Sequence, residues 1–376
     1  MYFLGGDRIY IKPERACKSL DEQISNCIHQ LQKINSGKQV FKLNFFVDTV
    51  SSEDYESLKG DVQNQIHQNF STDLVVAFIA QPPLTCRIIV EAFYYDASAW
   101  TKSFIGDGEH TACLFENEST RFLIGNAAAN QNLSFQENAE LAFSSLDSLL
   151  KKEKFEVQNI IRQWNYLENI LGYDNDQQRY QVFNNVRSDF YGNSFEENGY
   201  PAATGIGMNR GGVIIEFVAV QSDEVISKPV DNPDQISAHR YSEEVLVGEE
   251  CVLKTTPKFE RARYLTSGEN KIIMISGTAS ITGERTIGVG DAEKQTETTI
   301  ANIQRLYSDE VLQQLSEQKL IPKYGHARVY VKNKGDFPVI KRTFRKTYGN
   351  LPVVYIIADI CRDDLLVEIE GKVILE

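Results

Sequence analysis

The chain has 376 residues, 42% of them apolar and 24% charged, and 39 basic against 52 acidic residues give a net charge of −13. This composition is typical of a globular protein with two or three domains. The acidic balance and the lack of any Lys/Arg-rich run exclude a protein that binds the nucleic-acid backbone, which requires clustered cations. A protein that binds a small dianionic substrate is not excluded, because a pocket needs only a few local cations.

Targeting and metal-binding signals are missing from the sequence. No stretch approaches the roughly 18 apolar residues of a membrane span, and the first residues lack the basic and apolar regions of a signal peptide. The six cysteines form no CxxC pair, and the five histidines show no HxxH or HxxxH spacing. These patterns favour reduced thiols, a cytoplasmic location, no membrane partner and no metal site.

The first third of the chain has the pattern helix, strand, helix, strand, strand. These predicted elements are Leu20–Ile34, Gln39–Asp48, Ser52–Phe70, Leu74–Ala80 and Cys86–Tyr95. An opening hairpin before the first helix is either missing or kept in reduced form in Tyr2–Ile11.

The same order returns twice. The second copy is predicted as Glu137–Leu150, Phe155–Trp164, Gln177–Tyr191, Ala202–Met208 and Gly212–Val220. The third is predicted as Ala292–Leu306, His326–Val331, Phe337–Tyr348, Leu351–Ile360 and Leu365–Ile374. In both copies an apolar strand precedes the first helix, at Phe122–Ala127 and Met274–Ala279. Three copies of one βαβαββ unit therefore account for almost the whole chain.

The last strand of each copy carries a glutamate after three apolar residues. These glutamates are Glu91, Glu216 and Glu368. Because side chains alternate between the faces of a strand, we expect Leu365, Val367 and Ile369 on one face and Leu366, Glu368 and Glu370 on the other. Three such sheets can close around a common axis with their helices outside. We therefore predict an α/β (α+β) protein of mixed sheets, with clefts between neighbouring units.

The repeats divide the chain into four parts. We expect a degenerate first repeat at 1–105, a second repeat at 106–222, a connecting segment at 223–268 and a catalytic third repeat at 269–376. The connecting segment is too long for a simple linker, which favours a functional loop or lid across a cleft.

The glycine-rich run Thr204–Gly212 has the composition of a phosphate-binding loop. However, a strand rather than a helix follows it, so a hairpin turn at Asn209–Gly212 is favoured. Neither a P-loop motif nor G-x-S-x-G occurs, which excludes P-loop enzymes and the commonest serine hydrolases.

Two further features leave alternatives open. Arg261 and Arg263 either hold a carboxylate through paired hydrogen bonds or form a solvated basic pair balanced by Glu260. Glu368 is either a partly solvated strand acid or, in an apolar cleft, a general acid with a raised pKa.

The third copy resembles the YjgF/Rid superfamily. The stretches that carry this resemblance are Ile275–Ser280, Gly290-Asp291, Gln295-Thr296, Asn302-Ile303 and Leu366–Glu370. That superfamily forms trimers with a site at each subunit interface. The resemblance therefore implies one chain with a pseudo-trimeric arrangement of three Rid-like (chorismate mutase-like) units.

The chain is more specifically similar to the chorismatases, chorismate-cleaving enzymes of bacterial secondary metabolism. The matching stretches are Gln163–Tyr166, Arg179-Tyr180, Gly199–Gly207, Asn232–Gln235, Phe259–Ala262, Ile275–Ser280 and Ala358–Glu370. The resemblance implies hydrolysis of the enolpyruvyl ether of chorismate without a metal or organic cofactor. The products would be pyruvate and either a dihydroxycyclohexadiene carboxylate or a hydroxybenzoate.

The resemblance also assigns residues. Glu368 matches the catalytic acid of the family, and Arg261 is the first candidate to hold a substrate carboxylate. Thr278, Lys332 and Tyr355 are weaker candidates for substrate binding. Cys361 lies where the chemistry of the subgroups varies. The expected partner is chorismate or a related small carboxylate, bound by a monomer or small homo-oligomer.

The sequence departs from both families at specific places. Val252–Thr256 replaces the Tyr-Gly-Pro element of chorismatases and follows a segment rich in glutamate, with Glu243-Glu244 and Glu249-Glu250. This departure keeps open a catalytically silent Rid-like protein that binds a small acid. Val353 stands where Rid imine deaminases carry their substrate-binding arginine, so deaminase activity would need another arginine.

Overall fold

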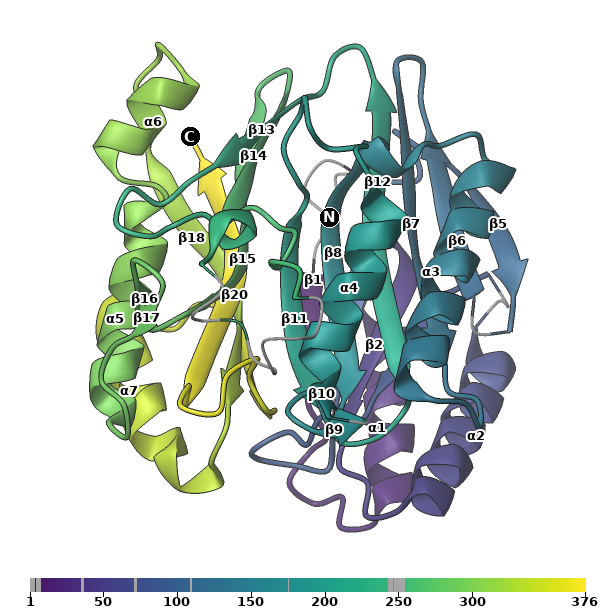
Figure 1. Cartoon of the computed structure of the whole chain (residues 1–376). Coiled ribbons are helices and arrows are strands. Elements are labelled where there is room, and N and C mark those ends of the chain that lie inside the picture. Colours follow the sequence, from purple (N-terminus) through teal and green to yellow (C-terminus); the bar gives the residue numbers. More distant parts are fainter. Residues whose placement is uncertain are drawn as a thin grey trace.

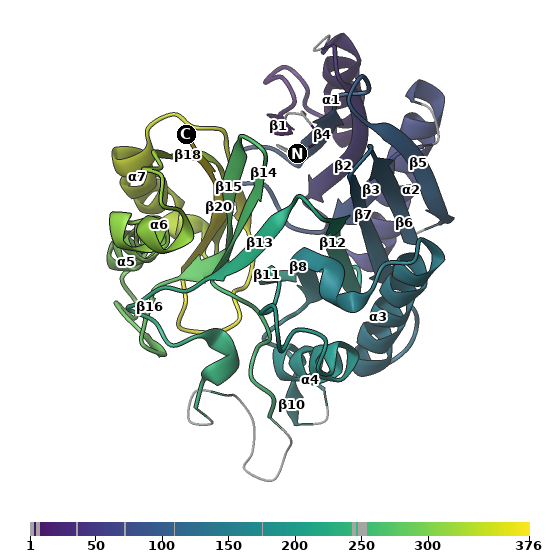
Figure 2. The same ribbon diagram turned by 90° about the horizontal axis from the view of Figure 1, so that it is seen from above.

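The computed structural model describes residues 4, 8–34, 37–70, 73–108, 110–174, 176–242, 246 and 254–376. The described elements form three large sheets that stand around a common centre, and most of the helices lie on the outer faces of the sheets (Figures 1 and 2). The predicted α/β class with mixed sheets is confirmed.

The first sheet has the strand order β1-β4-β2-β3. Its elements are β1 (Arg8–Ile11), α1 (Leu20–Lys33), β2 (Gln39–Val47), α2 (Ser52–Asn69), β3 (Val75–Ile79) and β4 (Ile88–Tyr95). Strand β4 runs antiparallel to β1 and β2, while β2 and β3 are parallel. The short β1 shows that the first copy keeps an opening strand.

The second sheet has the order β11-β8-β12-β7-β6-β5. Its elements are β5 (Thr101–Asp107), β6 (His110–Glu116), β7 (Thr120–Ala129), α3 (Phe135–Lys152), β8 (Ile160–Glu168), α4 (Arg179–Tyr191), β11 (Ala202–Met208) and β12 (Val213–Ser222). The strands from β7 to β11 reproduce the four-stranded pattern of the first sheet, and β5 and β6 extend it.

The third sheet has the order β13-β14-β15-β20-β18-β19. Its elements are β13 (Ile226–Val230), β14 (Ala262–Ser267), β15 (Asn270–Ala279), α5 (Ala292–Arg305), α6 (Asp309–Leu315), β18 (Pro322–Val331), α7 (Phe337–Tyr348), β19 (Val353–Ile357) and β20 (Val367–Leu375). The same four-stranded pattern appears from β15 to β19. Strands β13 and β14, which lie within 223–268, extend this sheet.

Short elements complete the chain. Two small hairpins pair β9 (Tyr173–Asp174) with β10 (Gln177–Gln178) and β16 (Ile281–Thr282) with β17 (Arg285–Thr286). Single 3₁₀ turns are η2 (Val157–Asn159), η3 (Ala238–Arg240) and η5 (Lys334–Asp336).

Each sheet is buried on both faces. In the third sheet, Val367 and Ile369 pack against Ile340 and Phe344 of α7 on the outer side. The inner faces of the three sheets share one apolar cluster, to which Trp164 and many other residues contribute. Burial on both faces explains why the strands read as nearly continuous apolar runs.

Three local predictions were wrong. Strand β8 begins at Ile160 rather than Phe155, because the turn η2 comes first. Strand β20 begins at Val367, so the expected alternation does not reach Leu365, which packs into the central cluster, or Leu366, which packs toward the helices. The turn at 209–212 is no hairpin, because β8 lies between the two strands that it connects.

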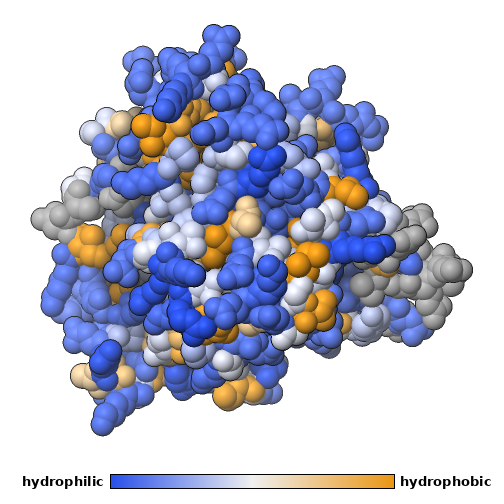
Figure 3. Space-filling model, turned by 90° about the vertical axis from the view of Figure 1, so that its left-hand side faces the viewer, coloured by the Kyte–Doolittle hydropathy of each residue, from blue (hydrophilic) through white to orange (hydrophobic). Residues whose placement is uncertain are grey.

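The hydropathy of the surface fits helices whose outer faces contact solvent. The side of the molecule covered by the helices of the third sheet carries mainly hydrophilic side chains, with small apolar groups among them (Figure 3). Among the described helices, none has the length and apolar character needed to cross a bilayer.

Candidate active site

A pocket lies where the second and third repeats meet, and Glu368 of β20 lines it. The other lining residues are Gln178, Tyr180, Gln181, Asn184, Tyr241, Leu246, Pro257, Phe259, Arg261, Gly277, Ala279, Ile281, Cys361 and Arg362. Helix α4 of the second repeat forms one wall, and β15 and β20 form the opposite wall. Neither repeat makes this site alone.

Glu368 is an isolated, buried carboxyl group. Its side chain is only 4% exposed, and no described residue forms a hydrogen bond or ion pair with it. Burial, together with the charge of Glu370, raises the pKa of Glu368 to about 8, although Arg162 and Arg261 oppose the shift. The group is therefore mostly a neutral carboxylic acid at pH 7, which is the form that can donate a proton.

Gly277 makes room for this carboxyl group. A Cβ atom at position 277 would lie 2.0 Å from Oε1 and 2.9 Å from the carboxyl carbon of Glu368. The backbone N–H of Gly277 also donates a hydrogen bond to Thr204 Oγ1 at 3.0 Å. A side chain at 277 would displace the acid, so the glycine is required by close packing rather than by a turn.

Two arginines line the same pocket. Arg261 Nη2 donates to the carbonyl oxygen of Ile236 at 2.8 Å and to the hydroxyl of Tyr241, while its buried Nε has no partner among the described residues. Arg362 Nη1 donates to the carbonyl of Glu284 at 2.8 Å. The two guanidinium groups are thus fixed in place and supply positive charge for a bound anion.

Polar groups of α4 and the connection after β19 complete the wall. The buried Nδ2 of Asn184 is left without a hydrogen-bond acceptor by the residues that the structure describes. Burial raises the pKa of the Tyr180 hydroxyl, and burial with the nearby Glu368 raises the pKa of the Cys361 thiol to about 12. At neutral pH both groups are protonated, so Cys361 is no thiolate nucleophile.

Only some of the predicted site residues meet here. Arg261, Cys361 and Glu368 line the pocket, whereas Thr278, Lys332 and Tyr355 do not. The side chains of these three residues have other partners. Thr278 Oγ1 donates to the carbonyl of Ser276 at 2.9 Å, Lys332 Nζ is paired with Asp363 Oδ1 at 2.7 Å, and Tyr355 packs on Phe337 and Phe344 beneath α7.

Several pocket residues were missed by sequence reasoning. Tyr180, Gly277 and Arg362 lie within stretches that resemble chorismatases, and that signal could have identified them. Asn184 carries no comparable signal, because only the folded chain brings it to the pocket of Glu368.

The middle of the connecting segment contributes to the pocket. Tyr241, Leu246, Pro257 and Phe259 all line it. The glutamate pairs at 243–244 and 249–250, and residues 252–253 of the altered stretch, lie outside the described residues. Within the described ranges, no group of three or more His, Cys, Asp or Glu side chains is arranged to hold a metal ion.

The chain is similar to known proteins in sequence and in fold. The family described as "Chorismatase FkbO/Hyg5-like, N-terminal" matches residues 99–219. A 3-hydroxybenzoate synthase of Streptomyces hygroscopicus is 31% identical over 249 residues, which cover 64% of this chain and 70% of that protein. A chorismatase of the same organism is 34% identical over 176 residues, 46% of this chain and 48% of that protein.

A crystal structure of a chorismatase at 1.08 Å resolution has the same fold over 98% of both chains, with a TM-score of 0.71 and 21% sequence identity. This likeness shows that the fold is shared over all three repeats. Because the match to the 3-hydroxybenzoate synthase spans more than two thirds of that relative at 31% identity, the chain belongs to the chorismatase family.

Proposed function

We propose that this protein hydrolyses the enolpyruvyl ether of chorismate and releases pyruvate without a cofactor, with Glu368 as the general acid. The observation that carries the proposal is a buried carboxyl group, whose pKa is raised to about 8, in a pocket with two arginines. An acid that remains protonated at neutral pH and lies beside fixed cations suits an anionic substrate that must accept a proton.

The chemistry needs one proton and one water molecule. Glu368 gives its proton to the terminal carbon of the vinyl ether, which becomes a methyl group, and the ether carbon becomes an oxocarbenium ion. Water, or a hydroxyl group of the substrate, then attacks this carbon. After water attack, collapse of the hemiketal breaks the bond to the ring oxygen and gives pyruvate and a ring alcohol. The Glu368 carboxylate regains a proton from the attacking oxygen.

The arginines would hold the two carboxylates of chorismate. Arg261 and Arg362 provide charge, and Asn184 and Tyr180 provide further hydrogen bonds. Cys361 lies next to Glu368 and is a neutral thiol, so it would shape the space around the reacting ring. Whether the ring product is a dihydroxycyclohexadiene carboxylate or a hydroxybenzoate is decided in this part of the pocket.

The three repeats also explain why the proposed site lies at one interface. They would be Rid-like units that imitate a trimer in one chain, at 1–105, 106–222 and 269–376, with the connecting segment at 223–268. Among the residues that the structure describes, Glu91 and Glu216 then have an ion-pair partner and Glu368 has none. The proposed partner is chorismate or a close relative, and the chain would act as a monomer or small homo-oligomer.

Two other functions are less well supported. A silent binding protein was expected to have a closed or cation-free cleft beside Glu368, whereas two arginines line this one. For an imine deaminase, Val353 offers no charge and packs against the helix-side core of the third sheet.

The direct test is to incubate purified protein with chorismate. Pyruvate is followed by its enzymatic reduction, and the ring product is identified by mass. Release of pyruvate well above the uncatalysed rate supports the proposal, and the product mass selects the subgroup. Folded protein that gives no pyruvate contradicts it.

Replacing Arg261 by Gln is expected to raise KM for chorismate by about 10- to 100-fold, because a hydrogen bond to a charged group contributes roughly 1.5–3 kcal/mol. Steady-state kinetics measure the effect. Arg342→Gln on α7, which has a 65% exposed side chain far from the pocket, is the matched control. An unchanged KM in Arg261→Gln would remove Arg261 from substrate binding.

Replacing Gly277 by Ala is expected to lower kcat with little change in KM. The new methyl group displaces the Glu368 carboxyl group, and a misplacement of about 1 Å at a reacting group costs roughly 100-fold in rate. Gly335→Ala is the control, since a Cβ atom there meets nothing within 4 Å. Equal kcat values for wild type and Gly277→Ala would show that the acid has no fixed position.

A further inference from the structure

Three buried ion pairs connect the repeats in turn. Lys42 Nζ of the first repeat lies 3.1 Å from Glu216 Oε2 of the second, and Arg162 Nη2 of the second lies 2.7 Å from Glu370 Oε2 of the third. The cycle closes where Arg328 of the third repeat pairs with Glu91 of the first. These six side chains are at most 3% exposed.

The three cations occupy the same position in their sheets. Each lies on the second strand of its repeat, opposite the residue two places after the glutamate of the last strand. The register pairs are Lys42 with Phe93, Arg162 with Val218, and Arg328 with Glu370. By this register, Glu91 and Glu216 correspond to Glu368 and not to Glu370.

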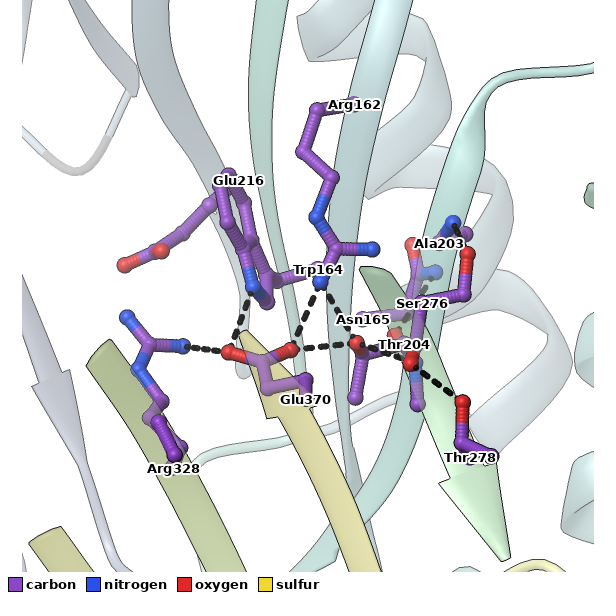
Figure 4. A network of polar contacts seen from close by, with 12 residues as sticks. Arg162, Trp164, Asn165, Ala203, Thr204, Glu216, Ser276, Thr278, Arg328 and Glu370 are labelled. Atoms are coloured by element: carbon purple, nitrogen blue, oxygen red, sulfur yellow. Dashed lines mark hydrogen bonds and ion pairs between the residues drawn. The ribbon is translucent and has the colours of Figure 1, made fainter. Parts of the chain in front are cut away.

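The cyclic pattern is therefore broken at one point. Glu91 and Glu216 each accept a cation from the preceding repeat, and the same rule would pair Arg162 with Glu368. Arg162 instead pairs with Glu370, which also accepts a hydrogen bond from Trp164 Nε1 at 2.9 Å and lies 3.2 Å from Arg328 Nη1 (Figure 4). Glu370 is an additional carboxylate that has no counterpart in the other two repeats.

We propose that Glu370 is a positioning residue, which holds Arg162 away from Glu368 and so leaves that acid unpaired and able to donate its proton. This inference rests on the proposed function only for its effect on turnover. Its effect on the protonation of Glu368 holds for any substrate.

The contacts show that Arg162 and Glu368 are near neighbours. Thr204 Oγ1 accepts a hydrogen bond from Arg162 Nη2 at 2.7 Å and another from Gly277 N at 3.0 Å, and it donates one to Glu370. A Cβ atom on Gly277 would touch both the Thr204 methyl group, at 3.1 Å, and Glu368 Oε1. Buried Arg162 Nη1 has no acceptor in the part of the chain that the structure describes, so Arg162 has a donor available for Glu368.

The charges around Glu368 determine whether a substitution nearby raises or lowers its pKa. The titratable and charged groups that face it are Arg162, Tyr180, Tyr241, Arg261, Tyr330, Cys361, Arg362 and Glu370. In Glu370→Gln a negative charge is lost and Arg162 is released, and both changes favour the ionised form of Glu368. In Arg162→Gln a positive charge is lost, which favours the protonated form.

The first test is the pH dependence of kcat/KM for chorismate. The activity of an enzyme with a general acid falls as pH rises through the pKa of that acid. We expect this fall to move to lower pH by about 1–3 units in Glu370→Gln and to higher pH in Arg162→Gln. A merely structural role would lower the rate of both variants without moving the profiles in opposite directions, and that result would overturn the inference.

The second test needs no substrate. Infrared difference spectra of each protein and its Glu368→Gln derivative follow the protonated carboxyl band of Glu368 against pH. The same opposite shifts are expected, and either variant alone tests the sign if the other fails to fold. Shifts in this titration without pyruvate release would reject the proposed function but keep the inference. An unshifted titration in a folded variant, with pyruvate release intact, would reject the inference alone.

Glu216→Gln is the matched control for both tests. It removes the carboxylate of the equivalent ion pair with Lys42, which lies between the first and second repeats. Circular dichroism checks its fold. The titration of Glu368 is expected to stay unchanged in this variant, because its charge change is not next to the pocket. A shift as large as that of Glu370→Gln would mean that any change in the central ion pairs perturbs Glu368, and would overturn the assignment to Glu370.

Discussion

Replacing Glu368 by Gln is expected to slow pyruvate release from chorismate by about 10²- to 10⁴-fold, the usual contribution of a general acid. An amide fills the same space as the acid but cannot give a proton to carbon. None of the described residues forms a hydrogen bond or ion pair with the Glu368 carboxyl group, so the substitution breaks no polar contact between described side chains. The loss should therefore fall on kcat, with KM nearly unchanged.

Steady-state kinetics with chorismate measure this effect, and circular dichroism confirms the fold. Glu293→Gln at the start of α5 is the control, because that carboxylate is 51% exposed and pairs only with Arg342 among the described side chains. Turnover by Glu368→Gln within threefold of wild type, with both proteins folded, would mean that another group protonates the substrate.

The same substitution is expected to make the protein more stable at alkaline pH. Burial first, and Glu370 second, raise the pKa of Glu368 from 4.5 to about 8. A group whose pKa rises on folding contributes stability that is fully present below pH 4.5 and is lost as pH increases through 8. At roughly 1.4 kcal/mol per pKa unit, this loss is on the order of 5 kcal/mol, or about 6 °C in Tm, for a chain of this size.

Thermal unfolding from pH 4 to pH 9 measures the linkage. The Tm of Glu368→Gln relative to wild type is expected to rise steadily across the window from pH 4.5 to 8 and to be constant outside it. Parallel curves for the two proteins would show that folding does not raise the pKa of Glu368. In that case the acid would be ionised at neutral pH, and the proposed proton transfer would lose its donor.

The repeat was visible in the sequence because its elements are set by local patterns. The amphipathic stretch Phe337–Tyr348 and the apolar run Ala202–Met208 have the same bounds in the structure as in the prediction. Periodicity did not predict the start of β8, where the short turn η2 precedes the strand. Apolar Phe155 extends the strand-like pattern of the sequence, although it lies outside the strand. Periodicity also failed for Leu365 and Leu366, because alternation holds only inside a strand.

The site was only partly predictable. The predicted residues that line the pocket are Arg261, Cys361 and Glu368, and all three lie in stretches that resemble a family. Tyr355 was misplaced because residues of one strand face opposite layers, and its side chain points into the core under α7. Asn184 reaches the pocket through the packing of α4 against the third repeat, which no local pattern encodes.

The ion pairs of the centre were not predicted, although the sequence carries a signal for them. Lys42, Arg162 and Arg328 are each a basic residue within the buried part of the second strand of a repeat. Aligning the three repeats would have revealed one basic residue at a common position. Their partners could not be deduced in this way, because the third repeat alone has a second glutamate, Glu370, two residues after the first.

Fusion of three repeats into one chain allows a single interface to differ from the others. In a trimer of identical subunits, a residue such as Glu370 would appear three times and would act at every interface. Here Glu91 and Glu216 remain in ion pairs that hold the repeats together, while Glu368 has no ion-pair partner among the described residues and faces a pocket. Under the proposed function, stability and chemistry are thus assigned to equivalent positions of different repeats.

The most direct test of the central claim is to run the reaction with chorismate in D₂O and to examine the methyl group of the pyruvate by NMR or mass spectrometry at early times. Protonation of the vinyl carbon by Glu368, whose exchangeable hydrogen comes from the solvent, predicts pyruvate that carries one deuterium in its methyl group, formed at a rate that collapses in Glu368→Gln. Pyruvate formed just as fast by Glu368→Gln, or no pyruvate from folded wild-type protein, would contradict the account.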